Sequence, residues 1–178
     1  ISDILKLLPL LSADHLTTLL TQKTVAAAQL QGIYTHANSN HKVQQSVYNH
    51  SVFTLKTLND FYAKGLLNSQ KIATHLQDPS VDVTVDFLKK LLQADALDAS
   101  TWALIILHPK ADNAVLQAAI DHKEFAKFVI ALSKEQLSSF YKKVDKKVIL
   151  TDDHRFAISK HASFQGNGRR DFYSYLTY

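Results

Sequence analysis

The stretch "LLSADHLTTLL", residues 10–20, contains the pattern that most clearly predicts the fold. Ser12 follows two leucines, and Leu16, Leu19 and Leu20 recur four, seven and eight residues after it. Serine is a favoured helix N-cap, because its side chain accepts a hydrogen bond from a free backbone N–H group of the first turn. Offsets of four, seven and eight describe one face of a helix. The stretch therefore predicts a helix that begins after Ser12 and buries its leucine face.

The same arrangement returns as "LLNSQKIATHL", "ALDASTWALII" and "ALSKEQLSSFY", with Asn68, Asp98 and Ser133 in the position of the cap. Each cap follows a leucine, and apolar residues follow at the same three offsets, with His75 as the single exception. A second helical pattern precedes each cap. The repeated phrase therefore predicts two helices joined by a tight, capped turn.

The spacing of these caps indicates a repeat. The interval between Ser12 and Asn68 has room for one more copy, which Ser39 supplies in degenerate form with Val43 and Val47 behind it. The caps then follow one another at intervals of 27, 29, 30 and 35 residues. Periods of this size are typical of stacked helical hairpins. The alternative is an irregular bundle, in which leucine-rich helices with polar caps align by chance.

On these phrases the chain resembles the HEAT-like and armadillo-like helical-hairpin families over residues 1–145. The resemblance implies a layered fold of the α-solenoid type and no specific activity. The predicted fold class is therefore all-α, as stacked helical hairpins or as an irregular α-helical bundle.

Composition also favours a helical protein. The chain has 178 residues, of which 46% are hydrophobic and 20% charged, as in an ordinary globular domain. Four glycines and three prolines are too few for the turns of a β-sandwich or barrel. The absence of cysteine excludes disulfides, a thiolate zinc site and a cysteine nucleophile. No apolar run approaches the roughly 18 residues of a membrane helix, and no signal peptide is visible.

We expect a single domain over residues 1–178, because no low-complexity linker divides the chain. The chain lacks methionine and opens on Ile1, so we interpret it as a fragment of a larger protein or a processed form. Gly65 is placed to end a helix, and Pro79 and Pro109 to separate helices. Residues 146–150 are expected to be extended, and 164–170 to form a loop. The predicted helices cover residues 3–9, 13–22, 24–36, 41–64, 69–77, 82–94, 99–107, 112–121, 123–131, 134–143, 152–162 and 171–177.

Residues 142–178 form a basic, aromatic C-terminal region. Residues 1–133 carry eleven basic and eleven acidic side chains, whereas residues 134–178 carry nine and five and account for the net charge of +4. A glycine loop followed by two arginines at a helix start could hold an anion through N–H groups and guanidinium forks. The candidate anion-binding residues are Lys142, Lys143, Lys146, Lys147, Arg169 and Arg170. The alternative interpretation is a solvated basic face beside a structural cap of aromatic residues.

Catalytic and metal-binding patterns are weak. Asp152, Asp153 and His154 form the best acid–base group, because an aspartate beside a histidine can orient the imidazole. Thr151 followed by two acids is also typical of a helix start, and we prefer that interpretation. The nine histidines lack an HExxH or similar spacing. We therefore predict no enzyme activity in this chain, no catalytic residues, no metal and no cofactor.

These observations favour a non-catalytic protein-interaction module, a helical-repeat scaffold within a larger protein that binds another protein. The alternative is a targeting domain whose basic region binds an anionic lipid headgroup such as a phosphoinositide. A third hypothesis is a helical accessory domain of an enzyme. A nucleic-acid partner is not predicted, because no recognised motif accompanies the charge. The composition resembles that of virulence effectors secreted by intracellular bacterial pathogens, which suggests a soluble protein in a host-cell cytosol.

Overall fold

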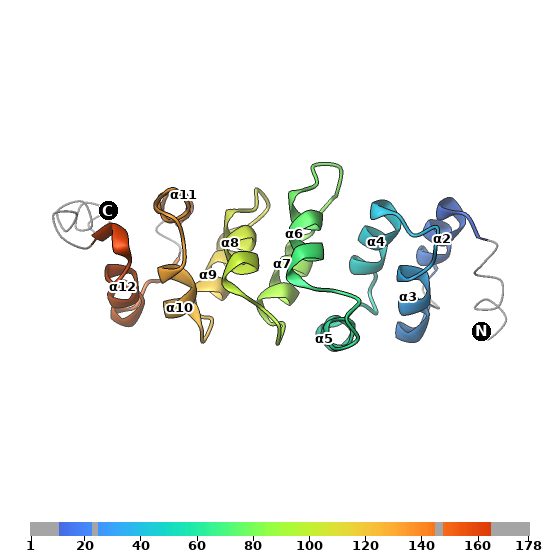
Figure 1. Ribbon diagram of the computed structural model, residues 1–178, viewed down its shortest axis with the longest axis horizontal. Coiled ribbons are helices and arrows are strands. Elements are labelled where there is room, and N and C mark those ends of the chain that lie inside the picture. The colour runs from blue at the N-terminus through green and yellow to red at the C-terminus, as the bar shows by residue number, and fades with distance from the viewer. Residues whose placement is uncertain (1–10, 23–24, 145–147, 165–178) are drawn as a thin grey trace. The chain divides into compact units, whose positions relative to one another are not determined.

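The computed structural model describes residues 11–22, 25–144 and 148–164, of which 63% are helical (Figure 1). These residues form eleven α-helices and one 3-10 turn, and they contain no strand. The predicted all-α fold class is therefore confirmed. The helices predicted at 3–9 and 171–177 lie outside the described residues, as does most of the predicted loop at 164–170. Of the piece predicted to be extended, only residues 148–150 are described, and they form neither helix nor strand.

The contacts divide the chain into two compact units, residues 1–96 and residues 97–178. The predicted single domain over residues 1–178 stays a prediction. The described part of the first unit contains α2 (Ala13–Leu20), α3 (Ala27–Tyr34), α4 (His41–Tyr48), α5 (Leu55–Ala63), α6 (Ser69–Gln77) and α7 (Val85–Leu92). The described part of the second contains α8 (Ala99–Leu107), α9 (Asn113–Ile120), α10 (Phe125–Ile130), α11 (Lys134–Lys143), α12 (Asp152–Ser159) and the 3-10 turn η2 (Ala162–Phe164).

The four strongest cap predictions are confirmed. Each predicted residue has extended backbone, and its side chain accepts a hydrogen bond from the N–H group three residues later. The accepting oxygen lies 3.3 Å from the donor nitrogen at Ser12, 2.9 Å at Asn68, 2.8 Å at Asp98 and 3.2 Å at Ser133. These bonds satisfy N–H groups that a helix start leaves without an intrahelical acceptor. They also explain why α6, α8 and α11 begin where the sequence predicted; these three helices end at the predicted residues as well.

The predicted cap at Ser39 is wrong by one residue. The Ser39 N–H donates to the His36 carbonyl at 2.9 Å, which keeps Ser39 in the turn that follows α3. Asn40 is the extended residue instead, and its Oδ1 accepts from the Val43 N–H at 3.0 Å. With this correction, the caps of alternate helices at 12, 40, 68 and 98 follow one another at intervals of 28, 28 and 30 residues.

The repeat is finer than the sequence phrases suggested, because every helix from α2 to α9 follows it. The N-cap positions of these eight helices are 12, 26, 40, 54, 68, 84, 98 and 112. Six of the seven intervals are 14 residues and one is 16. One helix with its connection therefore takes about 14 residues, and one hairpin takes twice that number. The arrangement is compatible with a helical-repeat fold.

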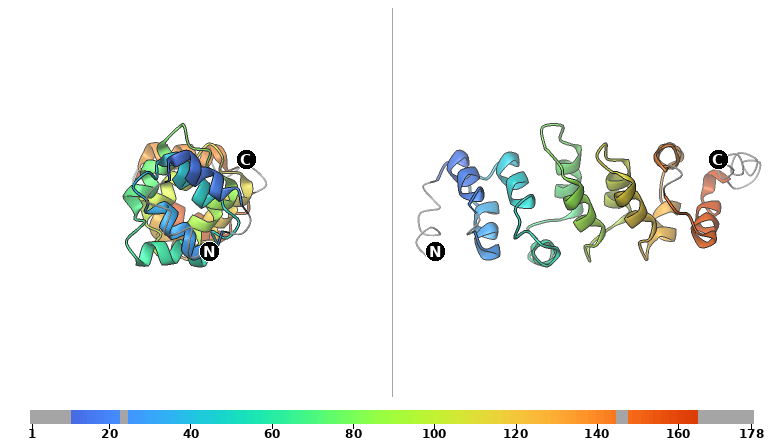
Figure 2. Two further views of the ribbon diagram at one scale, coloured as in Figure 1. Left: turned by 90° about the vertical axis from the view of Figure 1, so that its right-hand side faces the viewer. Right: turned by 180° about the vertical axis from the view of Figure 1, so that it is seen from behind.

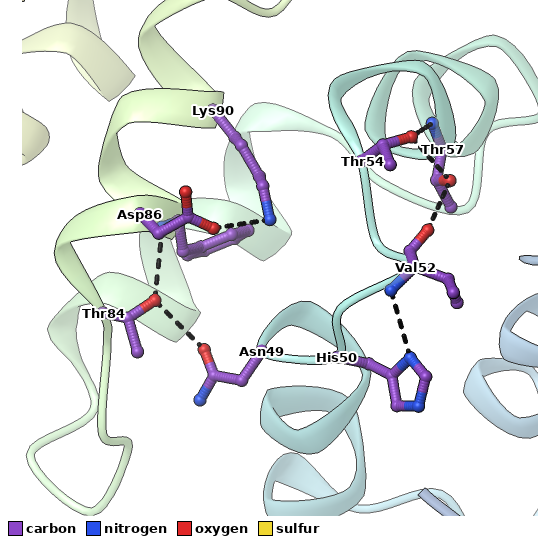
Figure 3. A network of polar contacts seen from close by, with 9 residues as sticks. Asn49, His50, Val52, Thr54, Thr57, Thr84, Asp86 and Lys90 are labelled. Atoms are coloured by element: carbon purple, nitrogen blue, oxygen red, sulfur yellow. Dashed lines mark hydrogen bonds and ion pairs between the residues drawn. The ribbon is translucent and has the colours of Figure 1, made fainter. Parts of the chain in front are cut away.

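The single helix predicted over residues 41–64 is wrong, because α4 and α5 are separate (Figure 3). In the connection, His50 Nδ1 accepts from the Val52 N–H at 3.3 Å, and the Thr57 hydroxyl donates to the Val52 carbonyl at 3.2 Å. Thr54 then caps α5 through the Thr57 N–H. Polar side chains thus bind backbone groups that a continuous helix would use, and this competition ends α4.

The turn after α5 is closed by Gly65, as predicted. Gly65 has a φ of 67° and is the only residue with positive φ in the described part of the chain. Its N–H donates to the Tyr62 carbonyl at 2.9 Å, and the Leu66 N–H reaches back to the Phe61 carbonyl at 2.9 Å. These two bonds define a Schellman motif, in which a left-handed residue ends the helix.

Replacing Gly65 with alanine should lower the free energy of unfolding by roughly 1–2 kcal/mol, because a Cβ disfavours left-handed backbone. The loss should be conformational, since an added Cβ would meet no heavy atom within 4 Å. Urea denaturation measures it. Gly65→Asn is the matched control and should lose less, because asparagine tolerates this conformation. Equal losses for alanine and asparagine would contradict the explanation.

Several helices that are two apart in sequence pack side by side within a unit. In the first unit α2 lies against α4, and α5 against α7 (Figures 1 and 2). In the second unit α10 contacts both α8 and α12. Consecutive helices also touch, as α3 does α4 and α8 does α9. This alternation is the packing of stacked hairpins, in which each hairpin buries its apolar face on the next.

Candidate functional site

A groove open to solvent in the first unit is the candidate site. Its cavity of about 460 Å³ lies among α3, α4, α6 and the turn before α6. That volume falls in the range of ligand sites in proteins. We call it the polar groove and define it by its lining: Tyr34, Thr35, His41, Gln44, Leu66, Gln70, Lys71, Thr74 and His75.

His75 is a buried polar group of this groove. Only 5% of the residue is exposed, and its ring lies edge-on to Tyr48 and Phe87, with centroid distances of 4.6 and 5.8 Å. Neither ring nitrogen has a hydrogen bond to another described residue. Burial lowers the pKa of His75 from 6.5 to about 4, and the charge of His41 lowers it further, against the opposite effect of Asp78. The imidazole is therefore neutral near pH 7, and it brings unused hydrogen-bonding capacity to the groove.

Tyr34 adds a hydroxyl whose own proton is available. The Tyr48 hydroxyl donates to the Tyr34 oxygen at 3.1 Å, so Tyr34 is the acceptor of this pair. Burial raises the pKa of Tyr34, and the hydrogen bond from Tyr48 opposes the shift. The pKa of Tyr48 is raised well above its usual value, mainly by burial. Both phenols are therefore protonated near neutral pH, and Tyr34 can donate to a ligand.

His41 is held in place by Asp78 at the edge of the groove. Its Nδ1 lies 2.7 Å from the Asp78 Oδ2, and both groups reach solvent. Hydrogen bonds from Ser80, together with the bond to His41, lower the pKa of Asp78 to about 2. An ionised carboxylate only accepts hydrogen bonds, so Nδ1 of His41 carries the proton. The pair orients the imidazole and leaves its Nε2 as the atom that can meet a ligand.

The polar side chains on α4 and α6 complete the groove. Gln44 and Gln70 make no side-chain hydrogen bond to another described residue. The Lys71 ammonium donates to the Leu66 carbonyl at 2.7 Å, which uses one of its three N–H donors. Each amide offers both a donor and an acceptor, as a peptide group does. The groove can therefore form several hydrogen bonds without breaking any that stabilise the fold.

The repeat explains why this groove is polar. Four residues after the cap, α2 to α9 carry leucine, isoleucine or tryptophan in every helix except α4, which has Gln44. Seven residues after the cap, every helix carries an apolar residue except α6, which has His75. Sequence reasoning noticed His75 but missed Gln44, Tyr34 and Lys71. Gln44 can be recognised in the sequence as a polar residue at an apolar position of the 14-residue repeat. A single helix over residues 41–64 does not show this, because it obscures the repeat.

A second cavity, in the second unit, has a different character. It measures about 530 Å³ and is lined by Asn113, Ala114, Gln117, Asp121, Ile149 and Thr151. The Gln117 amide donates to the Ile149 carbonyl at 3.2 Å and accepts from the Ile149 N–H at 2.7 Å. A further bond joins it to Asp121 at 2.9 Å. This amide is occupied in holding residues 148–150 against α9, so the cavity offers a ligand less than the polar groove does.

The predicted anion-binding set is only partly described. Lys142 is exposed near the end of α11, and the Lys143 ammonium donates to the His108 carbonyl after α8. Burial lowers the pKa of Lys143. The other four residues lie outside the described part of the chain: Lys146, Lys147, Arg169 and Arg170. The structure thus gives Lys143 a contact within the fold, and the anion site stays a prediction.

The preferred interpretation of Thr151 as a helix start is confirmed. The Thr151 hydroxyl accepts from the His154 N–H at 3.3 Å, and the Thr151 N–H donates to His154 Nδ1 at 3.2 Å. Asp152 and Asp153 occupy the first turn of α12, where acidic residues suit the positive end of the helix dipole. His154 therefore uses the nitrogen that a general base would need in a reciprocal capping box.

Metal-binding clusters and membrane-spanning helices are both absent from the described residues. No three histidine, aspartate or glutamate side chains among them are grouped to hold a metal ion. None of their helices combines the length and apolar character that crossing a membrane requires.

Comparisons with protein-family models, curated proteins and solved structures gave no match to this chain. The resemblance to HEAT-like and armadillo-like families therefore rests on the helical architecture alone, and the resemblance to secreted effectors on composition alone.

Proposed function

We propose that the chain is a non-catalytic protein-interaction module built from helical hairpins, and that the polar groove binds an extended segment of a partner protein. The observation that carries this proposal is the set of polar groups with unused hydrogen-bonding capacity along one groove: Tyr34, Gln44, Gln70 and His75. Of these four, only His75 is buried without a hydrogen bond to another described residue, whereas the Tyr34 hydroxyl accepts from Tyr48 and the two amides reach solvent. Donors and acceptors that converge on an open cavity with bonding capacity to spare favour a polar ligand.

A peptide suits this groove better than a small apolar molecule does. The amides of Gln44 and Gln70 can pair with the N–H and C=O groups of an extended backbone. The groove is open to solvent, as a site for a continuous chain must be. Helical-repeat proteins bind partners along surfaces formed by successive repeats. The groove residues come from α3, α4 and α6 and so belong to more than one helical hairpin of the first unit.

The alternative targeting function receives no comparable observation. Of its six candidate residues, only Lys142 and Lys143 are described, and Lys143 contacts the His108 carbonyl. An accessory role in an enzyme is likewise a hypothesis without an observation of its own in the described residues. The groove is therefore the feature that we propose to test.

The test is a selection of random dodecapeptides against the complete 178-residue chain, followed by affinity measurements on the enriched peptides. Gln70→Ala should weaken binding several-fold, the usual effect of losing one neutral hydrogen bond. Gln93→Ala is the matched control, because Gln93 is likewise an exposed glutamine, at the end of α7 and outside the groove. It should bind like the unmodified chain. A selection that enriches no peptide, or equal losses in both variants, would overturn the proposal.

A further inference from the structure

The charged groups at the polar groove indicate the charge of the peptides that it binds. Among the described residues that line it, Lys71 is the only permanently charged one, and none is an aspartate or a glutamate. After its bond to the Leu66 carbonyl, Lys71 has two N–H donors left, and that bond holds its ammonium beside the groove. Asp78, which binds His41 at the edge of the groove, already accepts from Ser80 and His41. A negative ligand group would therefore meet a positioned cation.

Neutral donors accompany this cation. Tyr34 can donate its hydroxyl proton because it accepts from Tyr48. Gln44 and Gln70 each carry an NH₂ group without a described acceptor. A carboxylate accepts several hydrogen bonds at once, and bonds that involve a charged group are the stronger ones. A ligand amide in the same place would be a weaker partner, because it is uncharged and because the Lys71 ammonium has no acceptor for its NH₂ group.

The register of the repeat supports a ligand at this point independently. A helix of this repeat stabilises the fold with apolar residues four and seven positions after its cap. Gln44 and His75 break that rule on two different helices, α4 and α6, and both line the same groove. His75 is 95% buried and unpaired among the described residues. Two departures that converge on one cavity are expected where the residues bind something, because apolar residues there would stabilise the fold better.

We propose that the polar groove selects a peptide segment that carries an aspartate or glutamate side chain, with Lys71 as the residue that reads the carboxylate and Gln44 as a second donor. The inference rests on the proposed function, because it names the chemistry of the same site. Gln44 occupies an otherwise apolar position, so Gln44→Leu restores the repeat pattern. This variant should fold at least as well as the unmodified chain and should lose peptide binding.

The experiment uses the peptides enriched on the complete chain, each resynthesised with its acidic residue changed to the matching amide. Fluorescence anisotropy should show at least a tenfold loss of affinity for the amide version, as expected for a hydrogen bond to a charged group. In Lys71→Gln the acidic and amide versions should bind alike. Lys56→Gln, which removes an exposed lysine of α5 outside the groove, should keep the preference. Raising the salt concentration should weaken only the acidic version, because salt screens exposed charges.

Each other outcome is informative. Peptides that bind without enrichment of an acidic residue would overturn the inference and leave the proposed function standing. A preference for the acid that survives in Lys71→Gln would show that another residue reads the carboxylate, and it would overturn the role given to Lys71. Full binding by a folded Gln44→Leu chain would exclude Gln44 as a donor. Failure to enrich any peptide would overturn this inference and the proposed function together. Circular dichroism of each variant confirms that the fold is intact.

Discussion

Replacing Trp102 with alanine is expected to lower the free energy of unfolding by about 3–5 kcal/mol, the usual cost of removing a large aromatic side chain from a core. Trp102 is fully buried in the second unit, as the sequence predicted. Its ring lies 5.8 to 6.0 Å from the rings of Phe125, Phe128 and Phe140, and its Nε1 donates to the Ala119 carbonyl at 3.2 Å. The substitution would leave a cavity among three helices and remove a buried hydrogen bond.

Chemical denaturation followed by circular dichroism measures this loss, since the variant lacks the chain's single tryptophan as a fluorescence probe. Phe156→Ala is the matched control. Phe156 is an aromatic residue of the same unit, but 63% of it is exposed, and the Lys160 ammonium lies over its ring at 4.6 Å from the centroid. Its replacement should cost less than about 1 kcal/mol. Similar costs for Trp102 and Phe156 would contradict a structural role for Trp102.

The second large effect is a loss of stability in acid that depends on His75. Its pKa is about 4 in the folded chain and 6.5 as an ordinary value, mainly because of burial. The unfolded chain therefore binds a proton more readily than the folded chain between these values. The contribution of His75 to the free energy of unfolding is therefore fully present above pH 6.5 and is lost as the pH is lowered towards 4. The difference between the two pKa values corresponds to about 3 kcal/mol.

Urea denaturation at several pH values between 7.5 and 4 would measure this dependence. His75→Leu places an apolar residue where the other seven helices from α2 to α9 have one, so it should remove most of the pH dependence in this range. The remainder comes from His108 and His122, because burial lowers the pKa of each of them as well. His15→Gln is the control, because His15 is exposed and glutamine can replace it in the capping box with Ser12. It should keep the unmodified profile. A parallel decline in His75→Leu would show that other groups cause the loss.

Local signals account for what the sequence predicted well. A cap is a hydrogen bond between residues three apart, and a helix face is a pattern within eight residues, so neither depends on distant parts of the chain. Asn68, Asp98 and Ser133 were found for this reason, and their helices begin where predicted. The error at residues 41–64 concerns local signals too, because the cap of α5 and the polar side chains of the connection before it act over two to five residues (Figure 3). The hydrogen bond from the Thr84 hydroxyl to Asn49, 35 residues away, at 3.2 Å is the part that a local pattern cannot predict.

The all-α class, the bounds of α6, α8 and α11 and the burial of Trp102 follow from the sequence alone, because helix propensity, caps and apolar faces act over a few residues. The candidate site, in contrast, depends on the tertiary structure. Tyr34, Gln44 and Lys71 belong to three different helices, and they share a groove because successive hairpins stack their apolar faces against one another. That stacking places polar side chains from separate repeats side by side. The sequence indicates these polar positions only after the helices are aligned on their 14-residue repeat.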